Sequence, residues 1–283
     1  MQIHIADTEK SVGNQSVIHP IVSQERKMSK SVAIVTGASS GIGKATALRL
    51  ARDFGAVVLA ARGGEKLSEV GEEIKAAGAE PLVLEVDLMA ASSAETVVQA
   101  TLERFGRIDA LVNVAGAVPG MDVFKMTDEQ WTTGMELKFH GARRLVIHAW
   151  DALKASKGAV VFISGNAAET PKPGAAAVGA INAAIEALAK AFSEQGIEDG
   201  VQVNSVSPGA IITGRRLAML EKAAAAKNIS VEQAKQGFLK QGGIARFGEA
   251  DEIANLIAFI VSPAARWMTG TVLRMDGGEV KSV

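Results

Sequence analysis

A glycine-rich turn near the beginning of the sequence has the spacing to hold phosphate groups. The apolar run Val32–Thr36 leads into Gly-Ala-Ser-Ser-Gly-Ile-Gly, after which a helical pattern starts. Glycine permits a tight turn and a close approach of pyrophosphate, and the free N–H groups at a helix start favour anions. The order of strand, turn, helix and second strand predicts a dinucleotide site, although a turn of this kind can also bind nothing. We expect the dinucleotide to contact Gly37, Ser39, Gly41, Ile42 and Gly43.

The residue that follows the second apolar run bears on the choice of dinucleotide. A carboxylate at this strand tip would accept the ribose 2′-hydroxyl of NAD and would repel the 2′-phosphate of NADP. The run ends instead at Ala61, which is followed by Arg62. A guanidinium forms charge-assisted hydrogen bonds with phosphate oxygens, so we predict NADP rather than NAD. In the alternative interpretation, Arg62 is a solvated loop residue.

Several other kinds of chemistry are excluded by the residue types. The absence of cysteine excludes disulfides, thiolate metal sites and cysteine nucleophiles, and it fits a reducing cytoplasm. The four histidines are dispersed and no carboxylate cluster accompanies them, so we predict no metal site. The sequence also contains no tyrosine, which removes the phenol as a general acid.

The pattern of apolar runs predicts the elements that must position these residues. The strand-like runs are rich in Val, Ile and Leu and nearly continuous, as expected for strands covered on both faces. They are 32–36, 56–61, 82–86, 110–113, 159–164, 201–206 and 271–275. Helical patterns alternate with them at 43–52, 65–77, 94–105, 128–155, 176–195 and 251–262. This order predicts a Rossmann-type α/β fold, a doubly wound seven-stranded parallel sheet in a single domain over 31–283.

Two segments fall outside this alternation. Residues 211–242 have the pattern of an inserted helical pair, and insertions there usually form a lid over a pocket at the carboxyl ends of the strands. Residues 1–30 mix charges with Asn and Gln, so we expect a mobile N-terminal arm, with an alternative start at Met28. In a second interpretation this arm ties subunits together.

Charge and hydropathy limit the partners. The 283 residues carry a formal net charge of −1, which leaves no bulk positive field for nucleic-acid phosphates. No apolar run approaches the roughly 18–20 residues of a membrane span. We therefore expect neither a nucleic-acid nor a membrane partner, and a cytoplasmic location.

Five segments together resemble the short-chain dehydrogenase/reductase family. Residues 36–43 are similar to its TGxxxGIG pattern, 86–88 to its adenine-contacting element, and 113–116 to its NNAG pattern with the second Asn replaced. Residues 207–213 resemble the PGxxxT segment that meets the nicotinamide carboxamide, and 276–278 resemble the closing DGG. The resemblance extends from Ser31 to Gly278. It implies further cofactor contacts from Asp87, Asn113, Gly116, Pro208, Ile211 and Thr213.

None of the four catalytic residue types of that family stands at its matching position. The family uses Asn, Ser, Tyr and Lys, with Tyr as the acid/base. Lys138 occupies the position of the Asn and Asn182 that of the Lys, so these two residue types are exchanged. Gly165 and Val178 occupy the positions of the Ser and the Tyr. A shift by one residue would supply Ser164, but no shift supplies a tyrosine.

Lys138 and Asn182 both interrupt apolar stripes of predicted helices. The neighbours of Lys138 three and four positions away are small or apolar, and Asn182 lies on the stripe of Ile181 and Ile185. A buried lysine needs a partner or loses its proton. We therefore hypothesise that Lys138 is the proton donor or an electrostatic clamp and that Asn182 holds the nicotinamide ribose. In the alternative, the site has drifted and Lys138 extends along the stripe to solvent.

Two functions fit these observations. The first is an NADP(H)-dependent oxidoreductase that acts on a carbonyl or secondary alcohol at a non-standard site. The second is a catalytically silent NADP-binding protein, a sensor or structural partner, because cofactor segments are preserved while four catalytic positions differ. The Ala, Leu and Met of the lid favour an apolar or aromatic small-molecule substrate. The family resemblance also implies a homodimer or homotetramer, formed through helices 128–155 and 176–191.

Overall fold

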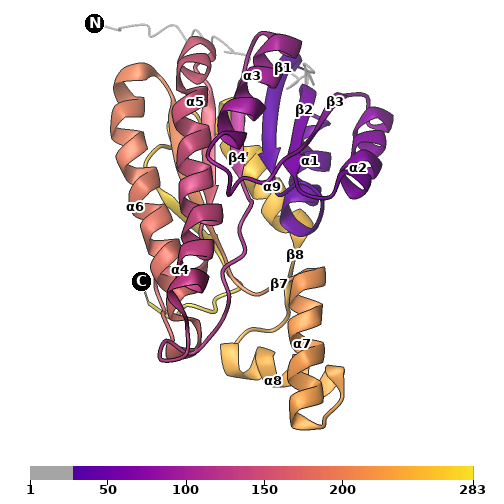
Figure 1. Cartoon of the computed structure of the whole chain (residues 1–283), viewed down its shortest axis with the longest axis vertical. Coiled ribbons are helices and arrows are strands. Elements are labelled where there is room, and N and C mark those ends of the chain that lie inside the picture. Colours follow the sequence, from indigo (N-terminus) through magenta and orange to yellow (C-terminus); the bar gives the residue numbers. More distant parts are fainter. Residues whose placement is uncertain (1–27, 283) are drawn as a thin grey trace, which may run out of the picture.

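The computed structural model describes residues 28–282 and confirms the predicted α/β architecture (Figure 1). Within this part of the chain, seven parallel strands form one sheet in the order β3-β2-β1-β4-β5-β6-β9. These strands are β1 (Met28–Thr36), β2 (Phe54–Ala61), β3 (Glu80–Glu85), β4 (Ala110–Asn113), β5 (Ala159–Ile163), β6 (Gln202–Pro208) and β9 (Val272–Met275). The helices on its faces are α1 (Gly41–Leu50), α2 (Gly64–Ala76), α3 (Ser93–Phe105), α5 (Gly141–Ser156), α6 (Ala176–Asp199) and α9 (Ala250–Ile260).

Alternate residues of the strands pack against two different layers of helices, one on each face of the sheet. In β1, Ala33 and Val35 pack into a core that includes residues of α1, α2 and α9. Val32 and Ile34 point to the other face and pack with residues of α3, α5 and α6. Both faces of the strand are therefore buried, because side chains alternate along it. This double burial explains why the strands appear in the sequence as continuous apolar runs.

The predicted helix over 128–155 is divided by a π-helical turn. It consists of α4 (Asp128–Gly134), the π-helical turn η1 (Met135–His140) and α5. The three pieces follow one another without a break in right-handed backbone geometry. Such turns are rare and frequently occur at functional sites. Lys138 lies within this one.

The inserted pair of helices is present as predicted. The short strand β7 (Ile211–Ile212) leads into α7 (Gly214–Lys227) and α8 (Val231–Gly242), and β7 pairs with β8 (Gly248–Glu249). In Figure 1, α7 and α8 project from the end of the molecule at which β7 and β8 lie.

The predicted boundary of the N-terminal arm is wrong. β1 already begins at Met28, which pairs with Phe54 of β2. Because β2 starts at Phe54, its backbone offers partners to the residues that precede Val32. Residues 1–27 lie outside the described part, and so do both interpretations of the arm.

The expectation that no segment has the length and composition of a membrane span is also wrong. The helical segment Pro173–Asp199, which contains α6, is long enough to span a membrane and has a mean hydropathy of 1.4. Its composition has an explanation in the fold, since α6 packs against β5 and β6 through residues such as Ile185 and Ala189. Up to Ala191 its exposed positions are mostly alanine, which adds apolar character without bulky side chains.

Candidate functional site

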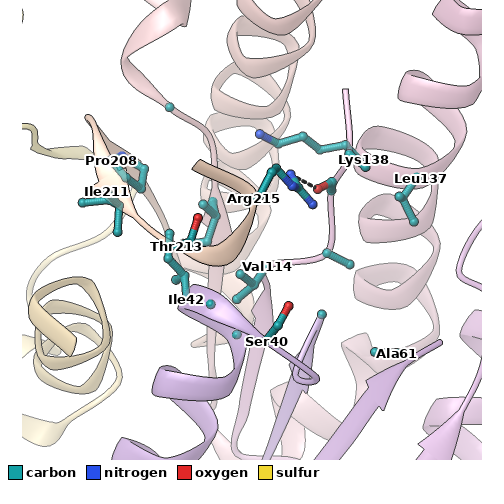
Figure 2. Close-up of a pocket in the computed structure, with 18 of the residues that line it drawn as sticks. Ser40, Ile42, Ala61, Val114, Leu137, Lys138, Pro208, Ile211, Thr213 and Arg215 are labelled. Atoms are coloured by element: carbon teal, nitrogen blue, oxygen red, sulfur yellow. Dashed lines mark hydrogen bonds between the residues drawn. The ribbon is translucent and has the colours of Figure 1, made fainter. Parts of the chain in front are cut away.

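A cavity of about 540 Å³ lies at the carboxyl ends of the strands. The strand order reverses between β1 and β4, and open α/β sheets bind ligands outside the strand ends at such a point. Figure 2 shows Pro208, Ile211 and Thr213 on one side of this cavity, and Leu137 on the other. Of the predicted site residues, those that line it are Gly37, Ser39, Gly41, Ile42, Gly43, Arg62, Asp87, Gly116, Lys138, Asn182, Pro208, Ile211 and Thr213.

The glycine-rich turn is shaped by close backbone packing. A Cβ atom at Gly43 would lie 2.1 Å from the carbonyl oxygen of Gly37, so no other residue fits without a shift of the backbone. Gly41 begins α1 with a φ of +54°, a conformation that favours glycine. The N-cap Ser40 forms no side-chain cap hydrogen bond, so its hydroxyl does not cap the first N–H groups of α1. The turn therefore provides the backbone cradle that a pyrophosphate requires.

The predicted cofactor residues beyond this turn have different surroundings. Arg62 lies exposed at the tip of β2 and lines the cavity, which is compatible with either interpretation of it. Asp87 lines the same region, and its Oδ1 accepts a hydrogen bond of 3.1 Å from Met89 N. Asn113 is buried and does not belong to the cavity lining. In the described part of the chain neither polar atom of the Asn113 side chain has a hydrogen-bond partner, so its predicted cofactor contact stays a prediction.

Lys138 and Asn182 contact each other directly. Lys138 Nζ donates one hydrogen bond to Asn182 Oδ1 and another, of 2.9 Å, to the backbone oxygen of Ser164. Asn182 Nδ2 in turn donates to the backbone oxygen of Gly165 at 3.3 Å. Asn182 and Ser164 are buried, whereas Lys138 is half-buried and lines the cavity. The Lys138 ammonium is therefore bonded within the protein and does not extend freely to solvent, whereas a drifted site stays an alternative.

The stem of Lys138 is held by the loop that follows β4. A Cβ atom added to Gly116 would lie 3.0 Å from Lys138 Cδ and 3.1 Å from Lys138 Cγ. The absence of a side chain at Gly116 therefore leaves room for the lysine to reach the end of β5. The small residue and the π-helical turn η1 together aim a long side chain at this point.

The surroundings of Lys138 favour loss of its proton. Burial, and to a smaller extent the positive charge of Arg215, lowers the pKa of Lys138 from 10.5 to about 8, while Glu186 opposes this change. Glu186 Oε1 accepts a hydrogen bond of 2.7 Å from Ser164 Oγ. Burial raises the pKa of Glu186, and the Ser164 hydrogen bond opposes that rise. A lysine with this pKa can exchange a proton near neutral pH.

Gly165 and Val178, which occupy the positions of the family's Ser and Tyr, also line the cavity. Gly165 has a φ of +153°, and a Cβ atom there would lie 2.8 Å from Asn182 Nδ2. A serine at this position would therefore disturb the amide that holds Lys138. Val178 offers no group that could transfer a proton.

Sequence reasoning missed three charged residues of this site, Arg215, Arg216 and Glu186. Arg215 lines the cavity, and its Nη1 donates a hydrogen bond of 2.8 Å to the backbone oxygen of Gly116 (Figure 2). Glu186 lies one helical turn after Asn182, behind Ser164. The position of Glu186 four residues after Asn182 was a signal that could have placed it on the same helix face. No comparable signal existed for Arg215, because the direction of a lid side chain depends on the tertiary fold.

Sequence comparison finds relatives that match almost the whole chain. A family model described as "Enoyl-(Acyl carrier protein) reductase" matches residues 37–279. A 3-oxoacyl-acyl-carrier-protein reductase of Staphylococcus aureus is 31% identical over 254 residues, covering 89% of this chain and 98% of the relative.

Solved structures of similar fold include complexes with a nicotinamide cofactor. The L-sorbose reductase of Gluconobacter frateurii, in complex with NADPH and L-sorbose, matches with a TM-score of 0.86 and 28% identity, covering 89% of this chain and 97% of that chain. A variant of the actinorhodin polyketide ketoreductase with NADPH matches with a TM-score of 0.83 and 29% identity, covering 88% of this chain and 97% of that chain.

Proposed function

Because the chain belongs to the short-chain dehydrogenase/reductase family, we propose that it is an NADPH-dependent oxidoreductase that interconverts a carbonyl and a secondary alcohol. In this proposal Lys138 takes the place of the missing tyrosine. The observation that carries it is the position of Lys138 Nζ, which is held at the cavity wall by Asn182 and the Ser164 carbonyl. Relatives that are reductases and neighbours solved with NADPH support the reaction class.

The residues of the cavity fit a phosphorylated dinucleotide. The turn from Gly37 to Gly43 would hold the pyrophosphate, and Arg62 would pair with the 2′-phosphate. The β2 tip carries Ala61, so it presents no carboxylate to repel that phosphate. Pro208, Ile211 and Thr213 would line the nicotinamide end. When bound, NADPH supplies the hydride for the carbonyl carbon.

Lys138 would donate or accept the proton that accompanies the hydride transfer. In the reducing direction the Lys138 ammonium donates a proton to the carbonyl oxygen, which becomes a hydroxyl group. In the oxidising direction neutral Lys138 accepts the hydroxyl proton. A pKa of about 8 makes both forms available close to neutral pH.

Asn182 and Glu186 would act through Lys138. Asn182 Oδ1 fixes the position of the ammonium, which leaves one Nδ2 hydrogen for a ribose hydroxyl. Glu186 holds Ser164 by its hydroxyl, and Ser164 presents its carbonyl oxygen to Lys138. Both are positioning residues for the proton donor. The lid over 211–242 would close on the substrate from α7, whose Arg215 and Arg216 already line the cavity.

One experiment tests this proposal against the silent-protein alternative. Binding of NADPH and NADH is titrated by cofactor fluorescence, and NADPH oxidation is then measured with a panel of ketones, aldehydes and quinones. We expect tighter binding of NADPH than of NADH, and turnover of at least one carbonyl. Lys138→Met should keep NADPH binding and lower kcat by about 10²–10⁴-fold, the usual contribution of a general acid.

The exposed Lys75 of α2 provides the matched control, since Lys75→Met should leave kcat unchanged. NADPH binding without turnover of any carbonyl would favour a sensor or structural partner. Turnover that survives in Lys138→Met would contradict the role of Lys138. No binding of either cofactor would contradict both functions.

A further inference from the structure

Two cations meet at the end of the cavity where the substrate would bind. Lys138 Nζ is bonded to two neutral oxygens, and Arg215 Nη1 is bonded to the neutral carbonyl of Gly116. Gly116 also packs against the Lys138 stem, so both side chains contact one residue. Among the described residues, neither cation forms an ion pair with a carboxylate.

The carboxylates around the cavity do not compensate this charge. In the described part of the chain, Asp87 is the single acidic residue of the cavity lining. Asp87 follows β3, whereas Ser164, which accepts a hydrogen bond from Lys138, follows β5. In the sheet, β5 lies four strand positions away from β3. With strands about 4.8 Å apart, this separation is on the order of 19 Å. Glu186 is nearer to Lys138 but does not line the cavity, and Ser164 Oγ donates to its carboxylate.

We infer that the substrate carries an anionic group, and that Arg215 and Lys138 bind it as an oxo acid, with the carboxylate on Arg215 and the carbonyl oxygen near Lys138. This inference rests on the proposed reductase function. A guanidinium pairs with a carboxylate through two parallel hydrogen bonds, which orients the substrate as well as binding it. Leu137 and Val178 supply an apolar wall for the remaining part, in agreement with the expected apolar or aromatic substrate.

The cofactor phosphates provide a less suitable partner for Arg215. They are accounted for by the glycine-rich turn and by Arg62, whereas Arg215 reaches across to Gly116 beside Lys138. A bound carboxylate would also favour the charged form of Lys138, which is the form that donates a proton. In the complete reaction the hydride adds to the carbonyl carbon and the Lys138 proton to its oxygen. The carboxylate is unchanged, and water returns a proton to Lys138.

The test compares an acid with its neutral ester. Phenylglyoxylate and methyl phenylglyoxylate are offered with NADPH to the wild type, to Arg215→Gln and to Arg104→Gln, a control at an exposed arginine of α3. We expect the wild type to prefer the acid. Arg215→Gln should lower kcat/KM for the acid by roughly tenfold to hundredfold, as for the loss of a charge-assisted hydrogen bond. Arg215→Gln should lower kcat/KM for the ester less than for the acid, and the Kd of NADPH and the Arg104→Gln rates should not change.

Equal or better use of the ester by the wild type would overturn the inference while leaving the reductase function intact. A weaker NADPH affinity in Arg215→Gln, with equal losses for acid and ester, would assign Arg215 to the cofactor and would also overturn it. If neither compound is reduced, benzoate and benzamide are titrated onto the NADPH complex by calorimetry. Binding of benzoate that Arg215→Gln removes would support the anion site, and equal binding of both compounds would overturn it.

Discussion

At the residue scale, the exchange of two residue types produces one direct contact. Lys138 and Asn182 come from different helices, and each satisfies the polar group that the other brings into an apolar stripe. A buried lysine without such an acceptor would pay a large desolvation cost. Without Lys138, Asn182 Oδ1 would lose its hydrogen-bond partner, and without Asn182 the Lys138 ammonium would keep only the Ser164 carbonyl.

Changes at Asn182 should shift the protonation of Lys138 in opposite directions. Asn182→Ala removes an acceptor that favours the ammonium, so the pKa of Lys138 should fall further. Asn182→Asp adds a negative charge, so the pKa of Lys138 should rise. We expect each substitution to change this pKa by roughly one unit. Both are measured by NMR titration of protein labelled with ¹³C at the lysine Cε atom, with the Lys138 signal assigned from Lys138→Met.

Lys154 is the internal control for this titration. Its hydrogen bond to Asp199 raises its pKa, and it lies on α5, away from Asn182. Its signal should titrate identically in all variants. A Lys138 signal that both substitutions leave unmoved would contradict the pairing.

Part of this site could be predicted from the sequence. The apolar neighbours of Lys138 and Asn182 indicated that both side chains face inward, and the glycine-rich turn indicated phosphate binding. The contact between the two could not be predicted, because it joins residues 44 positions apart through the fold. The course of Arg215 across the cavity likewise depends on how the lid is placed.

At the element scale, local backbone geometry explains why the usual residues are missing here. Helical periodicity predicted the helix over 128–155, but not the π-helical turn that positions Lys138, since this turn does not interrupt the helical composition. Gly165 follows β5 with a φ that side chains disfavour, and the space of its missing Cβ is taken by Asn182. A serine at Gly165 and an amide on Asn182 therefore compete for the same space.

Restoring the family's serine alone should harm the protein. Gly165→Ser should lower stability by about 1–3 kcal/mol through backbone strain and should also lower kcat, because the new side chain displaces Asn182 from Lys138. Gly106→Ser at the C-terminus of α3 is the matched control, since Gly106 also has a positive φ but no atom within 4 Å of an added Cβ.

Thermal unfolding and kcat distinguish the two variants. The control should lose stability and keep kcat, whereas Gly165→Ser should lose both. A Gly165→Ser protein with wild-type kcat would show that Asn182 does not need this space.

At the scale of the whole molecule, the seven-stranded parallel sheet and both helical layers could be predicted from the sequence, because nearly continuous apolar strands require cover on both faces. The surface through which subunits contact each other is less clearly indicated by the sequence pattern. The outward face of α6 carries exposed alanines at spacings of three and four residues, which permit close approach of a second helix. They are Ala180, Ala183, Ala187 and Ala191.

We expect this face to join subunits in the predicted homodimer or homotetramer. Ala187→Glu would place a charge in that contact, so the mass measured by sedimentation velocity should fall below that of the wild type. Ala76→Glu on the exposed end of α2 should leave the mass unchanged. A monomeric wild type, or an unchanged mass for Ala187→Glu, would contradict this assembly.

The pH dependence of kcat for carbonyl reduction tests the role of Lys138 most directly. The proton donor is the charged form, which is present below the pKa and is lost as the pH rises through it. We therefore expect the wild-type rate with NADPH to fall as the pH rises through about 8, and Lys138→Met to have a low rate without this fall. A wild-type rate that stays constant from about pH 6 to about pH 10 would contradict proton donation by Lys138.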